Sequence, residues 1–217
     1  MTDDLTLDEV RAALAPGIAA NAAFDGWSDE ARDLAADAAG IDRDIAALAF
    51  AGGAVDMIDA WFAEVDASMA AALPADTLAA MKIRDRIAAL VEARLAAVYP
   101  DRESLRRALA ILAMPQHLAR AAQLGWRSVD LMWRQAGDTA TDYNHYTKRA
   151  ILLGVYGATV TVFLEDDSED WADTRAFLAR RIEGIMRFEK AKAGFVNRAE
   201  YRPSLSRFIG RLRYPVS

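Results

Sequence analysis

The chain has 217 residues, of which 53% are hydrophobic, and carries a formal net charge of −6. This length allows one large domain with a sizeable core. The chain has no cysteine, which excludes disulfides, thiolate metal sites and cysteine nucleophiles. Ala, Leu and Arg, all strong helix formers, are abundant, and alternating β-branched residues are scarce, so we predict an all-α fold.

The first 53 residues predict short helices separated by glycine turns. Thr6 begins a capping-box sequence, and Pro16 is expected to break or kink the helix that follows. Ser28 can cap a second helix, and a third is predicted over about 42–50. This arrangement is typical of a helix-turn-helix subdomain, which we assign to residues 1–53.

Longer helices are predicted in the central region, residues 54–193. Gly125 is expected to divide one of them, and Gly194 to stop the last. The run from Ala150 to Leu164 is uncharged but has 15 residues, fewer than the roughly 20 of a membrane span, so we interpret it as a core helix. The predicted helices cover about 54–73, 76–98, 101–113, 115–135, 138–164 and 169–192.

The last part of the chain, residues 194–217, is predicted to be a linker followed by a short amphipathic helix. Residues 180–217 hold 10 Lys/Arg and 3 Asp/Glu, whereas residues 1–179 hold 16 Lys/Arg and 29 Asp/Glu. A basic tail of this kind indicates an anionic partner. From the residues alone, membrane attachment and docking on the protein body are equally good interpretations. The apolar face and two basic positions are Leu205, Phe208, Ile209 and Leu212 with Arg207 and Arg211.

The sequence gives little support to catalysis. His117 and His145 lie far apart, and neither belongs to a zinc-protease pattern or to the paired Glu-x-x-His motifs of a di-iron bundle. We find no nucleophile elbow and no phosphate-binding glycine loop. We therefore expect no cofactor, no metal and no enzymatic activity.

Charge also argues against DNA binding by the helix-turn-helix subdomain. Residues 1–60 contain 13 acidic and 3 basic side chains. Affinity for DNA comes largely from Lys and Arg that neutralise phosphates. We therefore expect no nucleic-acid partner.

One stretch of the sequence, residues 105–190, resembles a known family. The segments 111–115 (ILAMP), 130–133 (DLMW) and 136–152 (AGDTATDYNHYTKRAIL) together resemble the signature of the accessory lipid-binding proteins of ubiquinone biosynthesis, the ninth coenzyme Q biosynthesis family. This long pattern is far more specific than a short motif.

The resemblance implies a TetR-repressor-like bundle of about nine helices, with DNA binding lost, which forms a homodimer. It also implies that residues 54–193 bind an isoprenoid quinone or phospholipid in an apolar cavity, although the residues alone favour plain core packing. The expected lipid-binding residues are Leu112, Met114, Leu118, Met132, Trp133, Tyr146, Ile151, Leu152, Val155 and Tyr156.

The family's partner is the demethoxyubiquinone hydroxylase, a di-iron enzyme, to which it presents quinone intermediates at an anionic membrane. Because no mitochondrial presequence is evident, we expect a bacterial protein of the cytoplasm, attached peripherally to the inner membrane. The alternative is a TetR-type ligand-responsive transcriptional regulator. The resemblance places the partner-binding surface at Asp138, Asp142, Tyr143, Asn144 and Arg149.

Overall fold

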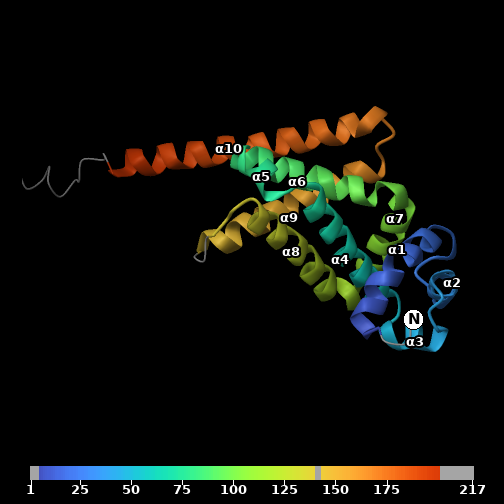
Figure 1. Ribbon diagram of the computed structural model, residues 1–217. Helices are drawn as coiled ribbons and strands as arrows, with labels where there is room; N and C mark the ends of the chain where they lie inside the picture. Colours follow the sequence, from blue (N-terminus) through green and yellow to red (C-terminus); the bar gives the residue numbers. More distant parts are fainter. Residues whose placement is uncertain (1–4, 140–142, 201–217) are drawn as a thin grey trace, which may run out of the picture. The chain divides into compact units, whose positions relative to one another are not determined.

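The computed structural model describes residues 5–139 and 143–200 of the chain (Figure 1). These residues form ten α-helices and three 3₁₀ turns, and no strand occurs among them, which confirms the predicted all-α class. The chain divides into two compact units, Met1–Leu178 and Ala179–Ser217. The three-part division predicted from the sequence stays a prediction, and the amphipathic helix expected near 203–213 lies outside the described residues.

The N-terminal helices are α1 (Leu7–Asp25), α2 (Asp29–Ala39) and α3 (Arg43–Ala49). Their predicted starts are confirmed: Thr6 forms a complete capping box, and Ser28 caps α2. Pro16 does not break the helix, because α1 continues through it. Buried side chains on both sides of the proline, such as Leu14 and Ile18, pack the helix in place and outweigh a penalty of about 3 kcal/mol.

The remaining elements follow the predicted order with three corrections to their boundaries. The helix expected over 76–98 is two helices, α8 is continuous through Gly125, and α10 is continuous through Gly194. The elements are α4 (Ala54–Ala72), α5 (Ala75–Ala79), α6 (Ile83–Val98), η1 (Tyr99–Asp101), α7 (Arg102–Leu112), η2 (Pro115–His117), α8 (Leu118–Gln135), α9 (Tyr143–Leu164), η3 (Glu169–Trp171) and α10 (Ala172–Glu200).

Each correction has a physical reason. At the break between α5 and α6, Arg86 donates to the carbonyl oxygens of Ala79 (3.2 Å) and Met81 (3.0 Å), which replaces helical hydrogen bonds. In α8, a Cβ on Gly125 would lie 2.8 Å from Cδ1 of Leu153. The glycine therefore lets α9 pack closely against α8 at this position. Gly194 costs its helix only about 1 kcal/mol, which does not end a helix by itself.

Within the unit Met1–Leu178, α4 packs against α1, α6, α7 and α8. Trp27 and Trp61 lie with ring centroids 5.3 Å apart, and Nε1 of Trp27 donates to the carbonyl oxygen of Ser104 at 3.0 Å. The hydroxyl of Ser104 in turn donates to the carbonyl oxygen of Ala19 at 2.6 Å. Helix α1 and the turn that follows it are therefore joined to α4 and α7 by buried contacts.

Helix α9 is the apolar helix predicted from the uncharged run. Among the described residues, one segment, His145–Leu164, is long and apolar enough to cross a membrane, and core helices of soluble proteins satisfy the same criterion. In this segment, 44% of the most apolar window is buried. Leu152, Tyr156, Val160 and Phe163 are its large buried side chains, which agrees with a core helix.

Candidate functional site

An apolar groove of ≈ 340 Å³ lies among helices α4, α6, α7, α8 and α9. Its volume falls at the lower end of ligand pockets, which measure about 300–1,000 Å³. It is partly open to the outside, and most of its lining is aliphatic. The lining residues are Phe62, Arg94, Leu105, Leu109, Leu112, Ala113, Leu118, Ala121, Gly125, Ser128, Leu153, Tyr156, Gly157, Val160 and Thr161.

The sequence of the helices explains why a groove remains here. Leu105, Leu109 and Leu112 follow one another at helical spacing, so α7 presents one apolar face to it. On the other side, Gly125 and Gly157 contribute no side chain. A Cβ on Gly157 would meet nothing within 4 Å, so the space beside it is empty.

A buried ion pair forms the polar part of the groove wall. The side chain of Arg94 is 2% exposed, and its Nε donates to Oδ1 of Asp66 at 2.7 Å. Its Nη1 donates to the hydroxyl of Tyr156. The rings of Phe62 and Tyr156 each lie with their centroid 5.2 Å from Cζ of Arg94. The charge on Arg94 is thus compensated by one carboxylate and covered by two aromatic rings.

Two further groups complete this network. The hydroxyl of Ser128 donates to Oδ2 of Asp66 at 3.0 Å, and Nε of Arg127 lies 3.7 Å from the same oxygen. Burial is the main cause that raises the pKa of Tyr156, although the charge on Arg94 opposes it. The phenol therefore stays protonated at neutral pH and keeps a proton that it can donate.

The structure gives the predicted lipid-binding residues different places. Three of them, Leu112, Leu118 and Tyr156, line the groove. Met114 and Tyr146 are 44% and 62% exposed, outside this lining. Also outside the lining, Met132 and Leu152 are buried in the core, and Trp133, Ile151 and Val155 are half-buried. The prediction for these residues as lipid contacts stays a prediction.

Several groove residues were not predicted from the sequence. Leu105 and Leu109 precede Leu112 on one face of α7, a periodicity that could have indicated them. Arg94 gave no such signal, because an arginine within a helical pattern is ordinarily exposed. Its partner Asp66 lies 28 residues away, which only the packing of α4 against α6 brings into contact.

The predicted partner-binding residues also divide. Arg149 is 2% exposed in its side chain, and it donates to Asp130 (2.6 Å) and Asp138 (3.0 Å). Asp138 also accepts from Lys148 at 2.7 Å. Burial would raise the pKa of Asp138, but the hydrogen bonds from Lys148 and then Arg149 outweigh it and lower the pKa. These contacts join α8 to α9, while the side chains of Asp142, Tyr143 and Asn144 lie outside the described ones.

An exposed aromatic side chain lies beside this network. Tyr146 is 62% exposed on α9, and its ring centroid is 6.2 Å from that of Trp126 on α8. Both Arg149 and Asp138 have side chains at most 5% exposed. Tyr146 is therefore exposed on α9, whereas Arg149 and Asp138 are held in the contact between α8 and α9. The partner-binding role expected of Asp138 and Arg149 stays a prediction.

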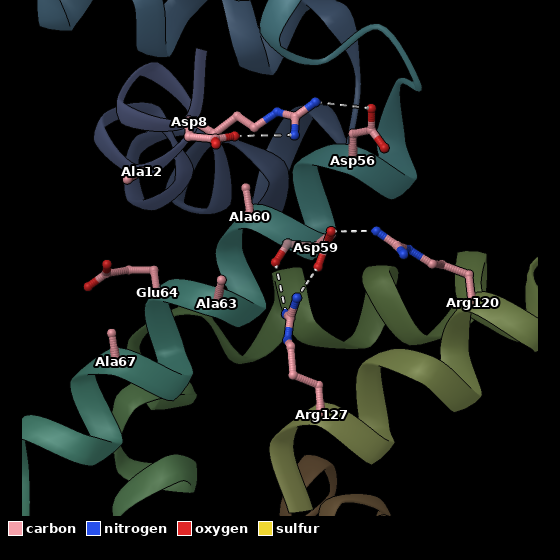
Figure 2. Close-up of a pocket in the computed structure, with 11 residues that line it drawn as sticks. Asp8, Ala12, Asp56, Asp59, Ala60, Ala63, Glu64, Ala67, Arg120 and Arg127 are labelled. Carbon is pink, nitrogen blue, oxygen red and sulfur yellow. Dashed lines mark hydrogen bonds and ion pairs between the residues drawn. The ribbon is translucent and has the colours of Figure 1, made fainter. Parts of the chain in front are cut away.

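A second, polar pocket lies between α1, α4 and α8 (Figure 2). Asp59 accepts from Arg120 and Arg127, both at 2.5 Å, and Arg11 pairs with Asp56 at 3.9 Å. These opposite charges pair with each other within the pocket, so they connect the helices. Among the residues that the structure describes, no group of three or more His, Cys, Asp or Glu could hold a metal ion.

The fold defines the class of protein to which this chain is similar. A solved TetR transcriptional regulator from Nitrosomonas europaea ATCC 19718 matches it with a TM-score of 0.64 and 23% sequence identity. The match covers 80% of this chain and 95% of the regulator. The predicted TetR-like fold is confirmed, and at this identity the likeness concerns the fold alone.

Sequence comparison then shows which family the chain is similar to. Residues 118–189, which include α8 and α9, match the COQ9 family model. The rat protein named "Ubiquinone biosynthesis protein COQ9, mitochondrial" is 45% identical to this chain over 96 residues, which is 44% of this chain and 31% of the rat protein. The human protein of the same name is 42% identical over 96 residues, which is 44% of this chain and 30% of the human protein. The Drosophila melanogaster protein of that name is 26% identical over 187 residues, which is 84% of this chain and 57% of that protein. The chain thus spans less than two thirds of these relatives, and the matches confirm the resemblance to the COQ9 family.

Proposed function

We propose that this chain acts in ubiquinone biosynthesis as a non-catalytic accessory protein that binds an isoprenoid lipid in the groove. The apolar groove is the observation that carries the proposal, because two of its walls, α8 and α9, lie in the region that matches the COQ9 family model. The names of the matched relatives support the pathway.

The apolar lining suits reversible loading from a membrane. Each buried CH₂ group gains about 0.8 kcal/mol when it leaves water. A lipid that moves from the bilayer into the groove leaves one apolar environment for another, so this gain largely cancels. The transfer is therefore close to neutral, as a protein that presents a lipid to an enzyme requires.

We propose that the presented lipid is handed to the demethoxyubiquinone hydroxylase, and that the exposed ring of Tyr146 forms part of the contact. Aromatic side chains such as tyrosine are enriched at protein interfaces. The proposal moves the contact from the buried Asp138 and Arg149 to a residue that a partner can reach. A homodimer, expected from the resemblance, stays a prediction.

We also propose peripheral membrane attachment through the basic amphipathic segment at 203–213, on the cytoplasmic side of a bacterial inner membrane. The sequence pattern of that segment supports it. Flotation with anionic liposomes, with and without residues 203–217, tests the attachment. Equal flotation of the truncated protein would contradict it.

The alternative function, transcriptional regulation, is opposed by charge. Arg11, Arg32 and Arg43 are the bases among residues 1–60, and each pairs with an acidic side chain. On α3, the counterpart of a recognition helix, Nε of Arg43 donates to Asp37 at 2.9 Å. Phosphate contacts would have to break these pairs within an acidic surface, so we do not expect DNA binding.

The groove is tested by filling it. Gly157 lines it beside empty space, so Gly157→Leu places a side chain there without a clash. We expect this variant to keep its fold, because leucine favours helix over glycine by about 1 kcal/mol. Its affinity for a ubiquinone with two isoprene units, measured by isothermal titration calorimetry, should fall at least tenfold.

Gly154→Leu is the matched control. Gly154 lies one turn earlier on α9, also beside open space, and does not line the groove. It should bind the quinone as the unmodified protein does. Unchanged binding by Gly157→Leu would show that the groove is not the lipid site.

A further inference from the structure

The groove wall contains an ion pair that binding of hydrocarbon alone does not explain. Arg94 lines the groove, and its partner Asp66 is buried next to it, outside the lining. Most of the other lining residues are apolar. Replacing a buried ion pair by hydrophobic side chains is often neutral or stabilising. A site for an isoprenoid tail would therefore lose nothing by having Leu or Phe at these positions. The polar groups indicate a ligand with a polar end.

The hydrogen bonds within the network leave donors for that polar end. Arg94 uses Nε for Asp66 and Nη1 for Tyr156. Among the described residues, Nη2 of Arg94 donates to none, and the hydroxyl of Tyr156 accepts from Arg94 but donates to none. Both groups belong to residues that line the groove. The wall thus offers N–H and O–H donors to a ligand oxygen.

Charge and size narrow the ligand further. Because Asp66 already neutralises Arg94, the wall favours a neutral acceptor, such as a carbonyl or ring oxygen, over an anionic phosphate. The groove holds ≈ 340 Å³, at the small end for drug-sized ligands, so a long polyisoprenoid cannot fit within it whole. Its far end must extend out through the open side.

We propose that the groove binds a quinone or phenol ring head first, with a ring oxygen hydrogen-bonded to Tyr156 and Arg94, while the isoprenoid tail extends past the leucines of α7 toward the membrane. This inference rests on the proposed function and adds the orientation of the ligand and the residues that hold its ring. It selects the quinone over the phospholipid as the ligand.

The test compares two ligands that share a decyl chain: decylubiquinone, whose ring carries oxygen atoms, and decylbenzene, whose ring carries none. We expect the unmodified protein to bind the quinone at least tenfold more tightly. Tyr156→Phe removes the phenolic donor and should lower this preference about fivefold, the effect of one hydrogen bond. The matched control Tyr146→Phe removes an exposed hydroxyl from the same helix and should leave the preference unchanged.

The preference is a ratio measured on one protein sample, so a partly unfolded variant lowers both affinities without changing it. A second measurement needs no variant: the infrared C=O stretch of the bound quinone should shift to lower frequency. Equal affinities for the two ligands, or an unshifted carbonyl band, would overturn the head-first orientation while leaving the groove as a lipid site. Failure of both ligands to bind would overturn the proposed function as well.

Discussion

Arg94 and Asp66 form an ion pair of 2.7 Å in which the two side chains are 2% and 6% exposed. The pair connects α6 to α4, and Arg94 is one of the residues that line the apolar groove. Its surroundings combine two aromatic rings with the hydroxyl of Ser128. The same contact therefore supports the helix packing and sets the polar part of the groove wall.

Removal of one member of this pair should be strongly destabilising. Asp66→Ala leaves the charge of Arg94 buried without its carboxylate, which typically costs about 3–5 kcal/mol. The control is Asp85→Ala, because Asp85 pairs with Arg84 at the surface, with both side chains 52% exposed. Such exposed pairs contribute about 0–1 kcal/mol. Urea denaturation measures both changes, and equal destabilisation would refute the structural role given to Asp66.

Stability should fall in acid through Asp166, which lies between α9 and η3. Burial would raise the pKa of this carboxyl, but hydrogen bonds from Ser168 and then Thr174 outweigh it and hold the pKa well below its ordinary range. A carboxylate whose pKa is lower in the folded state stabilises the fold at any pH above its pKa in the unfolded chain, about 3.9. This contribution is lost as the pH falls from there toward the pKa in the folded protein.

We therefore expect the melting temperature of the protein to decline below about pH 4. Asp166→Asn cannot ionise, so it should melt at a lower temperature near pH 7 and show a weaker decline in acid. Differential scanning fluorimetry from pH 3 to 7 gives both curves. Parallel curves for the variant and the unmodified protein would exclude Asp166 as the source.

How far the sequence predicts this structure differs between local and long-range features. The caps at Thr6 and Ser28 were predicted correctly because capping depends on residues within three positions. Pro16 and Gly125 misled the prediction, since each is held inside a helix by residues distant in the chain. Local propensity cannot show such packing.

The same distinction explains the candidate site. Helices α8 and α9 of the signature region form two walls of the groove, and the predicted residues Tyr156 and Leu112 line it, while their contact with lipid stays a prediction. Arg94 was not foreseen, because its importance comes from Asp66 and Tyr156, 28 and 62 residues away. A buried arginine in a groove wall arises only when helices far apart in sequence meet.

The last prediction separates the residues that position α9 from the one that faces outward. Arg149→Ala should destabilise the protein by about 1.5–3 kcal/mol, because it removes charge-assisted hydrogen bonds to Asp130 and Asp138. Both carboxylates keep a second partner, Arg134 and Lys148 respectively. Tyr146→Ala removes a side chain that is 62% exposed, so its free energy of unfolding should change by less than about 1 kcal/mol. Under the proposed function, this second variant should nevertheless bind the hydroxylase more weakly.

Pull-down and calorimetry with the purified hydroxylase, beside urea denaturation, distinguish these effects. The matched control is Leu48→Ala, since Leu48 is also 62% exposed but lies on α3, away from α8 and α9. We expect it to keep both stability and binding. Loss of binding by Leu48→Ala, or full binding by Tyr146→Ala, would contradict a contact centred on Tyr146. A stable Arg149→Ala that fails to bind would instead return Arg149 to the partner surface, because a residue that only positions α9 cannot be removed without a cost in stability.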